Sequence, residues 1–128
     1  MMLGKVKLFV FCITMLLQFS CGDPKGDSFS EKIDKATLQQ MAIGQDVQLI
    51  DVRTPMEYKL GYIGDAINFD INNQEQFLEQ ITLLDKEKPV YLYCKMGGRS
   101  NRAAELMKDK GFKKIYDYSG GYQDWISE

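Results

Sequence analysis

Strand-like and helix-like segments alternate along most of this 128-residue chain, and this alternation limits the fold more than any other feature of the sequence. The strand-like segments are short apolar runs between turn residues: 47–52, 66–69, 90–93 and 115–118. The helix-like segments carry capping signals or apolar residues at helical spacing: 30–41, 55–60, 73–84, 100–110 and 122–126. Strands joined through helices pair in parallel and are covered on both faces. The sequence therefore predicts an α/β fold, a single domain with a mostly parallel sheet and helices on both faces.

The helix predicted over residues 55–60 has the clearest local signals. Thr54 is a good N-cap, Pro55 suits the first helical position, and Glu57 completes a capping box. Gly61 is expected to end the helix.

Residues 1–20 have the composition of a secretory signal peptide. Lys5 and Lys7 precede an apolar run from Leu8 to Phe19, and the small residue Ser20 follows it. The run is shorter than the ~20 apolar residues of a membrane-spanning helix. This favours export with cleavage over the alternative, an uncleaved N-terminal anchor.

The segment from Leu17 to Cys21 (LQFSC) resembles a bacterial lipobox, in which the cysteine receives a lipid and becomes the new N-terminus. Gln18 stands where such boxes usually have leucine. Several acyl chains, at ~0.8 kcal/mol per buried methylene, attach a protein durably to a membrane. We therefore expect an exported, membrane-anchored lipoprotein facing the periplasm or the cell exterior. Its parts are a signal peptide over 1–20, a lipidated tether over 21–30 and the domain over 31–128.

Charge and composition exclude several classes of function. The formal net charge of −2, with 16 basic and 18 acidic residues, lacks the basic excess of nucleic-acid-binding proteins, so nucleic acid is not an expected partner. The chain has no histidine, which removes Ser-His and Cys-His catalysis and most zinc sites, and we expect neither a metal nor a cofactor. Beyond residue 20 the cysteines are Cys21 and Cys94, so one usable thiol remains and an internal disulfide is not expected.

The remaining thiol, Cys94, stands at the end of the predicted strand 90–93, where ligands bind in α/β folds. The loop that follows it consists of Lys95, Met96, Gly97, Gly98, Arg99 and Ser100. Two glycines allow successive N–H groups to turn toward one centre and bind an anion. Ser100 is expected to cap the next helix, whose positive end would face the same centre, and the two basic residues add charge.

These features favour the thiolate of Cys94 over the thiol. A free cysteine has a pKa of ~8.5, and a helix N-terminus with cationic neighbours lowers it. The alternative is that Cys94 is a small buried apolar residue at a strand end. An inert core cysteine, however, does not require two glycines and an arginine in the next five residues.

The run from Cys94 to Arg99 (CKMGGR) is similar to the active-site loop of the rhodanese family: a cysteine, two variable residues, a glycine, one residue and an arginine. Other segments resemble the opening and closing motifs of that family: 49–58, 61–68, 102–104, and Gly120-Gly121 followed by Trp125. The similarity covers nearly all of residues 35–127, with the motifs in the usual order.

The resemblance implies a rhodanese-like fold and sulfurtransferase activity. Cys94 would attack a sulfane sulfur donor such as thiosulfate and hold the outer sulfur as a persulfide. It would then pass the sulfur to a thiol, a cyanide-like acceptor or an acceptor protein, while the main-chain N–H groups of residues 95–100 stabilise the anionic sulfur. Asp51 and Arg53 would organise the site from the neighbouring strand end. For Arg53 and Glu57, an ion pair and a substrate contact are both open.

Two other functions use similar residues. Cysteine phosphatases and arsenate reductases also have a cysteine-to-arginine loop, but with five residues between the two, whereas four separate Cys94 from Arg99 here. A non-catalytic binding module with this fold is the second alternative, although such modules usually lack the cysteine. Tyr62 stands where the rhodanese family often has histidine, which leaves the substrate preference open.

The mature protein is expected to begin at a lipid-modified Cys21. Intact-mass measurement of the protein extracted from membranes should show the loss of residues 1–20 and the gain of acyl groups. A species that retains Met1, or one cleaved elsewhere without lipid, would contradict the prediction.

Overall fold

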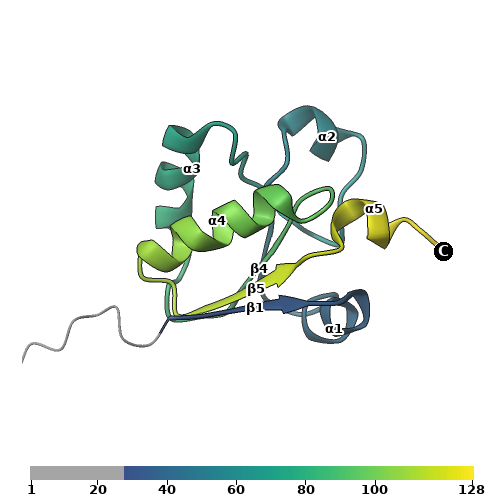
Figure 1. Cartoon of the computed structure of the whole chain (residues 1–128), viewed down its shortest axis with the longest axis horizontal. Coiled ribbons are helices and arrows are strands. Elements are labelled where there is room, and N and C mark those ends of the chain that lie inside the picture. The colour runs from purple at the N-terminus through teal and green to yellow at the C-terminus, as the bar shows by residue number, and fades with distance from the viewer. Residues whose placement is uncertain (1–27) are drawn as a thin grey trace, which may run out of the picture.

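The computed structural model describes residues 28–128, in which one sheet of five parallel strands has the order β1-β5-β4-β2-β3 (Figure 1). The strands are β1 (Phe29–Ile33), β2 (Gln48–Asp51), β3 (Ile67–Asn68), β4 (Val90–Tyr93) and β5 (Lys114–Tyr118). The helices are α1 (Lys35–Met41), α2 (Pro55–Lys59), α3 (Gln74–Gln80), the 3-10 helix η2 (Ile81–Leu83), α4 (Gly98–Asp109) and α5 (Gly121–Trp125). The predicted signal peptide and Cys21 lie outside the described residues.

The sheet separates two hydrophobic cores. Residues of α3 and α4 pack on one face with Leu92 and Cys94, and residues of α1 and α5 pack on the other face with Tyr91 and Tyr93 (Figure 1). Neighbouring residues of a strand point to opposite faces. All four residues of β4 are therefore buried, as is typical of a central parallel strand. The predicted α/β class, with helices on both faces of a parallel sheet, is confirmed.

Parallel pairing brings the carboxyl ends of the central strands to one edge of the sheet. β4 pairs with β2 on one side and with β5 on the other, in a register that sets Tyr93 beside Asp51 and Tyr118. The chain leaves β4 at Cys94 and leaves β2 at Val52, so residues far apart in the sequence meet at this edge.

The helix predicted over residues 30–41 is wrong in its first half. Phe29–Ile33 forms β1, which pairs with β5 along its whole length, and α1 begins only after Asp34. The Asp34 side chain accepts a hydrogen bond from the Thr37 N–H at 2.9 Å. Without β1, β5 would be the edge strand, and its backbone N–H and C=O groups on that side would have no partner in the sheet. The hydrogen bonds between β1 and β5 outweigh the weak helical pattern of residues 29–33. The first two residues of β1, Phe29 and Ser30, lie in the segment predicted to be the tether.

The other predicted elements occur at or close to their expected positions. The capping box of α2 is present, and α2 is followed by Leu60 as its C-cap. The helix predicted over 73–84 is shorter, because α3 ends at Gln80 and a 3-10 turn follows. Within residues 28–128, no helix is both long enough and apolar enough to cross a lipid bilayer.

The buried end of β1 should contribute to the stability of the domain. Ile33 is 6% exposed, so Ile33→Ala in a fragment of residues 28–128 should lower the free energy of unfolding by about 2–5 kcal/mol. Glu31→Ala, at an exposed position of the same strand, should change it by less than about 0.5 kcal/mol. Urea denaturation of the three fragments measures both effects. Equal effects of the two substitutions would contradict the packing of β1 against α1.

Candidate active site

Cys94 lies at the carboxyl end of β4, where the chain turns into α4. The residue is 1% exposed, and three residues, Lys95 to Gly97, separate it from the first residue of the helix. Gly97 has a φ of 99°, and a Cβ at this position would stand 2.5 Å from the main-chain oxygen of Ser119. The tight turn therefore requires glycine, for both its backbone conformation and its close approach to β5.

The Cys94 sulfur faces the inside of this turn. The Gly97 N–H donates a hydrogen bond to Sγ at 3.0 Å, and the Ser100 hydroxyl lies 3.5 Å from Sγ. Ser100 does not cap the helix as predicted: Gly97 is the N-cap, and Ser100 is the third residue of α4. Its hydroxyl also donates to the Gly97 carbonyl oxygen at 3.2 Å. The serine is fully buried, so its polar atom serves the cysteine loop rather than solvent.

The pKa of the Cys94 thiol is below its ordinary value. Burial raises this pKa, but hydrogen bonds from Ser100, Gly97 and Met96 favour the thiolate and outweigh the effect of burial. The predicted role of the loop N–H groups in lowering this pKa agrees with these hydrogen bonds. The thiolate is the nucleophilic form of cysteine, and here it forms without a histidine.

The start of α5 is hydrogen-bonded to the backbone of the cysteine loop. The Tyr122 N–H donates to the Cys94 carbonyl oxygen at 2.8 Å, and the Gln123 N–H donates to the Lys95 carbonyl oxygen at 3.1 Å. A Cβ on Gly121 would overlap these same carbonyl groups. The two free N–H groups at the start of a helix thus fix the loop backbone. The resemblance of Gly120-Gly121 to a family motif does not predict this contact.

Asp51 and Arg53 form a buried ion pair beside the loop, at the carboxyl end of β2. The Arg53 Nη2 lies 2.6 Å from Asp51 Oδ2, and the two side chains are 3% and 0% exposed. The same nitrogen donates to the Gly61 carbonyl oxygen at 2.7 Å. The guanidinium group lies 4.1 Å from the centre of the Tyr122 ring. The pair thus connects β2 with the segment after α2 and with α5.

Glu57 pairs with Arg99, whereas Arg53 pairs with Asp51, so an ion pair between Arg53 and Glu57 does not form. Arg99 Nη1 and Nη2 lie 2.6 and 2.8 Å from the two carboxylate oxygens of Glu57. Glu57 also accepts hydrogen bonds from Thr54, as the capping box predicts. The Arg99 hydrogen bonds lower the pKa of Glu57 to about 2; burial opposes this effect, and the hydrogen bonds from Thr54 add to the lowering.

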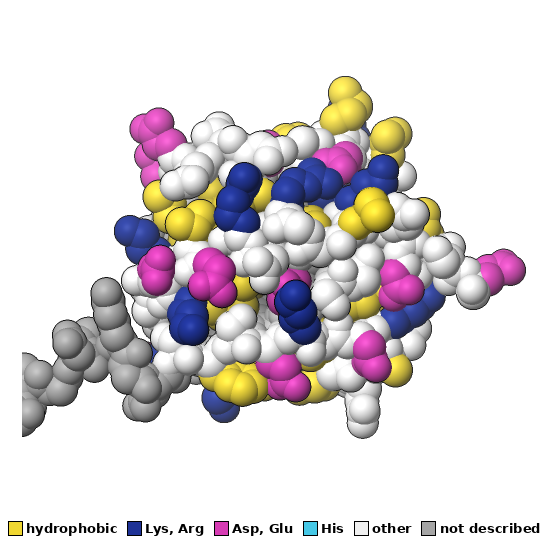
Figure 2. All heavy atoms as spheres, in the orientation of Figure 1, with side chains coloured by type: hydrophobic (Ala, Val, Ile, Leu, Met, Phe, Trp, Pro, Cys, Tyr) yellow, Lys and Arg dark blue, Asp and Glu magenta, His cyan; other side chains and the backbone are white. Residues whose placement is uncertain are grey.

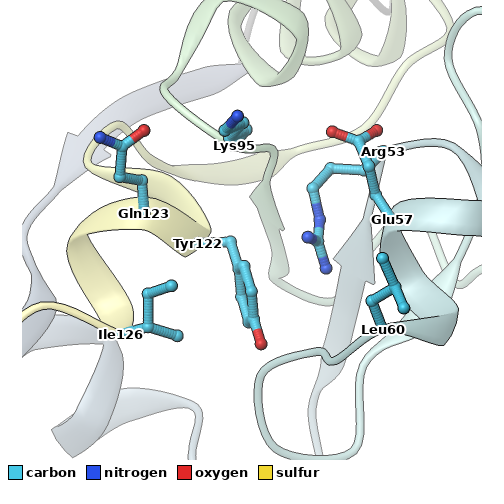
Figure 3. A pocket seen from close by; sticks show the side chains of 7 residues that line it. All are labelled: Arg53, Glu57, Leu60, Lys95, Tyr122, Gln123 and Ile126. Carbon is cyan, nitrogen blue, oxygen red and sulfur yellow. The ribbon is translucent and has the colours of Figure 1, made fainter.

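A cavity of about 430 Å³ opens beside the loop, between α5 and α2 (Figure 3). Its lining residues are Arg53, Glu57, Leu60, Lys95, Tyr122, Gln123 and Ile126. Figure 3 shows Tyr122 and Arg53 side by side in the cavity, with Leu60 and Ile126 on opposite walls. The cavity meets the cysteine loop at Lys95, and Cys94 itself, which is buried, is not one of its lining residues.

Comparison with known proteins points to one family. The sequence model of the rhodanese-like domain family matches residues 34–128. The chain is 41% identical over 78 residues to the protein YqhL of Bacillus subtilis, and 32% identical over 81 residues to the thiosulfate sulfurtransferase GlpE of Coxiella burnetii. These alignments cover 61% and 63% of this chain, and 60% and 73% of the relatives. Over 122 residues, 95% of this chain, it is 29% identical to the tRNA uridine(34) hydroxylase of Pelagibacter ubique, but it spans only 39% of that protein.

Solved structures share the fold. A rhodanese-related protein from Thermoplasma volcanium superimposes with a TM-score of 0.65 at 31% identity, covering 75% of this chain and 90% of that one. The human single-domain sulfurtransferase TSTD1 has the same TM-score at 22% identity, covering 82% and 96%, and shows the fold alone.

The pairing of Glu57 with Arg99 should appear in the pH dependence of stability. The pKa of Glu57 is lower in the folded state than the ordinary value of 4.5, so its contribution is complete above about pH 4.5 and is lost as the pH falls toward 2. Between pH 7 and pH 2.5, the difference in unfolding free energy between wild type and Glu57→Gln should shrink by about 1–2 kcal/mol, allowing for the partial exposure of the pair. Urea denaturation at the two pH values measures this. A pH-independent difference would contradict the assignment.

Proposed function

This chain belongs to the rhodanese-like family, and on that premise we propose that it is a sulfurtransferase that carries sulfur as a persulfide on Cys94. The observation that carries the proposal is the setting of the Cys94 sulfur, with the Gly97 N–H at 3.0 Å and the Ser100 hydroxyl at 3.5 Å. These donors surround one atom and favour its anionic form. A persulfide also bears its negative charge on sulfur, so the same loop is suited to stabilise it.

The reaction needs two displacements at sulfur. The Cys94 thiolate attacks the outer sulfur of a sulfane donor such as thiosulfate, the sulfur–sulfur bond of the donor breaks, and sulfite leaves with the bonding electron pair. The terminal sulfur of the resulting persulfide is then attacked by an acceptor thiolate or a cyanide-like nucleophile. The Cys94 thiolate leaves and is regenerated. The thiosulfate sulfurtransferase named among the relatives supports the choice of donor.

The entrance of the cavity has a positive charge, suited to an anionic sulfur donor, and exposed apolar side chains, suited to a larger acceptor. Lys95 is exposed at the rim of the cavity and attracts an anionic donor. Exposed apolar side chains stand nearby: Met56 and Leu60, associated with α2, are 70% and 83% exposed, and Ile126 is 63% exposed. Figure 2 shows hydrophobic side chains standing out at the α2 end of one face. This apolar rim favours an acceptor thiol carried on a larger molecule, such as an acceptor protein, over a small hydrated ion.

The loop is less suited to phosphatase or arsenate reductase chemistry. Four residues separate Cys94 from Arg99, and both terminal nitrogens of Arg99 are held by Glu57. The Arg99 guanidinium group is therefore bound to Glu57 of α2. In a loop that binds a tetrahedral oxyanion, the arginine must be free to bind the anion.

The proposed place of action is a membrane surface reached by export. It rests on the predicted signal peptide over residues 1–20 and on lipidation of Cys21, both outside the described residues. The folded domain would then act at the end of the tether, on the periplasmic side or at the cell exterior.

Cys94 should gain one sulfur atom when the protein is incubated with thiosulfate, because it is the thiol that the loop activates. Mass spectrometry of the intact protein and of the peptide that contains Cys94 detects the gain. Cys94→Ser should abolish it while leaving the thermal transition nearly unchanged, because the hydroxyl group is similar in size and a far poorer nucleophile.

A variant of Arg99 tests how the rate of sulfur transfer depends on the anchoring of the loop. Arg99→Ala removes the tie between the loop and α2 without removing the nucleophile, so transfer should slow but persist. Wild-type protein that takes up no sulfur from any sulfane donor would reject the enzyme and leave a binding module. A Cys94→Ser variant that still transfers sulfur would reject the assigned nucleophile.

A further inference from the structure

Lys35, the first residue of α1, contacts the C-terminal end of α5. Its Nζ donates hydrogen bonds to the main-chain oxygens of Asp124 and Ser127, at 3.3 and 2.9 Å. The same nitrogen lies 5.9 Å from the centre of the Trp125 ring. The two oxygens belong to residues 89 and 92 positions away from Lys35 in the chain. One half-buried lysine therefore joins α1 to the last turn of the domain.

The charge of Lys35 suits α5 better than it suits its own helix. A helix carries partial positive charge at its N-terminal end and partial negative charge at its C-terminal end. Lys35 stands at the first position of α1, where a cation is disfavoured. At the C-terminal end of α5 a cation is favoured, and it binds carbonyl oxygens that a helix end leaves without partners. The contact with α5 therefore accounts for a lysine at this position.

α5 depends on such contacts because it is short. It has only five residues, Gly121–Trp125, and isolated helices shorter than about 12 residues are marginal in water. β5 contributes one contact, since the Tyr118 hydroxyl donates a hydrogen bond to the Asp124 side chain. α1 contributes the other, through Lys35 and the main-chain oxygens. Without these contacts the end of α5 is expected to fray.

The N-terminal end and one side of α5 belong to the active site. The N–H groups of Tyr122 and Gln123 donate to the carbonyl oxygens of Cys94 and Lys95, at 2.8 and 3.1 Å. Tyr122, Gln123 and Ile126 also line the cavity beside the loop (Figure 3). The position of α5 therefore sets both the backbone of the cysteine loop and one wall of the cavity.

We propose that Lys35 is a positioning residue of the active site, which acts through α5 on the Cys94 loop and on this wall of the cavity. Ile126 stands between the two residues whose oxygens bind the ammonium group, so the contact fixes that part of the wall directly. The loop is fixed through the backbone of α5. The inference rests on the proposed function only in taking Cys94 as the nucleophile.

The contact itself can be followed through Trp125, which is the only tryptophan of the chain. Lys35→Met keeps a long unbranched side chain but has neither the charge nor the hydrogen-bond donors. In this variant acrylamide should quench the Trp125 fluorescence roughly twofold more efficiently, because the end of a short helix frays when a tertiary contact is lost. Lys35→Arg keeps both the charge and the donors, and should lie closer to wild type than to Lys35→Met.

The effect on the active site is measured at Cys94. The full chain is alkylated with iodoacetamide across a range of pH, and the rate at the peptide that contains Cys94 is followed by mass spectrometry. A looser α5 loosens the loop whose hydrogen bonds favour the thiolate. In Lys35→Met the midpoint of the profile should therefore rise by about half a pKa unit, which is a roughly threefold smaller thiolate fraction below the midpoint. Lys35→Arg should again lie closer to wild type.

Two variants and the salt concentration separate positioning from charge and from stability. Lys114→Met removes the charge of an exposed lysine at the start of β5, the end of the sheet away from the loop. Ile81→Val lowers the stability through the core on the other face of the sheet from α5. Both should keep the wild-type Cys94 midpoint. In about 1 M potassium chloride the Debye length is about 3 Å, so a direct effect of the Lys35 charge on the sulfur disappears and the positioning effect remains.

A wild-type Cys94 midpoint in Lys35→Met overturns the proposal, and so does the same rise in Ile81→Val or a rise that vanishes in high salt. A change in Trp125 quenching with an unmoved midpoint also overturns it, because the contact would then be merely structural. Neither measurement uses a sulfur donor. Failure here would therefore leave sulfur transfer by Cys94 standing, and failure of sulfur transfer would leave the effect of Lys35 on Cys94 measurable.

Discussion

The buried ion pair between Arg53 and Asp51 joins segments that lie far apart in the chain, and the active-site loop depends on it. The Arg53 guanidinium group also binds the Gly61 carbonyl oxygen and lies over the ring of Tyr122. The backbone of Tyr122 in turn holds the Cys94 carbonyl oxygen. Removing one partner of such a pair leaves a buried charge unpaired, which costs about 3–5 kcal/mol. The pair therefore ties the position of α5, and with it the cysteine loop, to the end of β2.

The loop replaces a general base with fixed hydrogen-bond donors. In a chain without histidine, the Cys94 thiolate is favoured by the Gly97 N–H and the Ser100 hydroxyl, which outweigh the burial of the sulfur. These donors are rigid because Gly97 packs against the backbone of Ser119 and because α4 holds Ser100. A small, preorganised site of this kind suits a reaction in which negative charge stays on sulfur throughout.

Much of the site could be predicted because its signals are local. The capping box joins Thr54 and Glu57 across three positions, and the turn that holds Cys94 is complete within six residues, so short-range sterics and hydrogen bonding define both. Contacts between distant segments were the ones that sequence reasoning missed or paired wrongly. Glu57 and Arg99 are 42 positions apart, and β1 pairs with β5 more than 80 positions away, so no periodicity or spacing reveals either contact.

The sequence by itself determined the α/β class, the order of most elements and the cysteine loop, because hydrophobic period, capping residues and glycines act over a few residues. Only the tertiary structure decided which charges form ion pairs, the strand conformation of residues 29–33 and the burial of the acidic residue Asp117 in β5. The physical reason is that the free energy of a buried charge depends on the groups that pack against it, and that of an edge strand depends on the strand that pairs with it. Those neighbours are chosen by the packing of the whole domain and not by the adjacent residues.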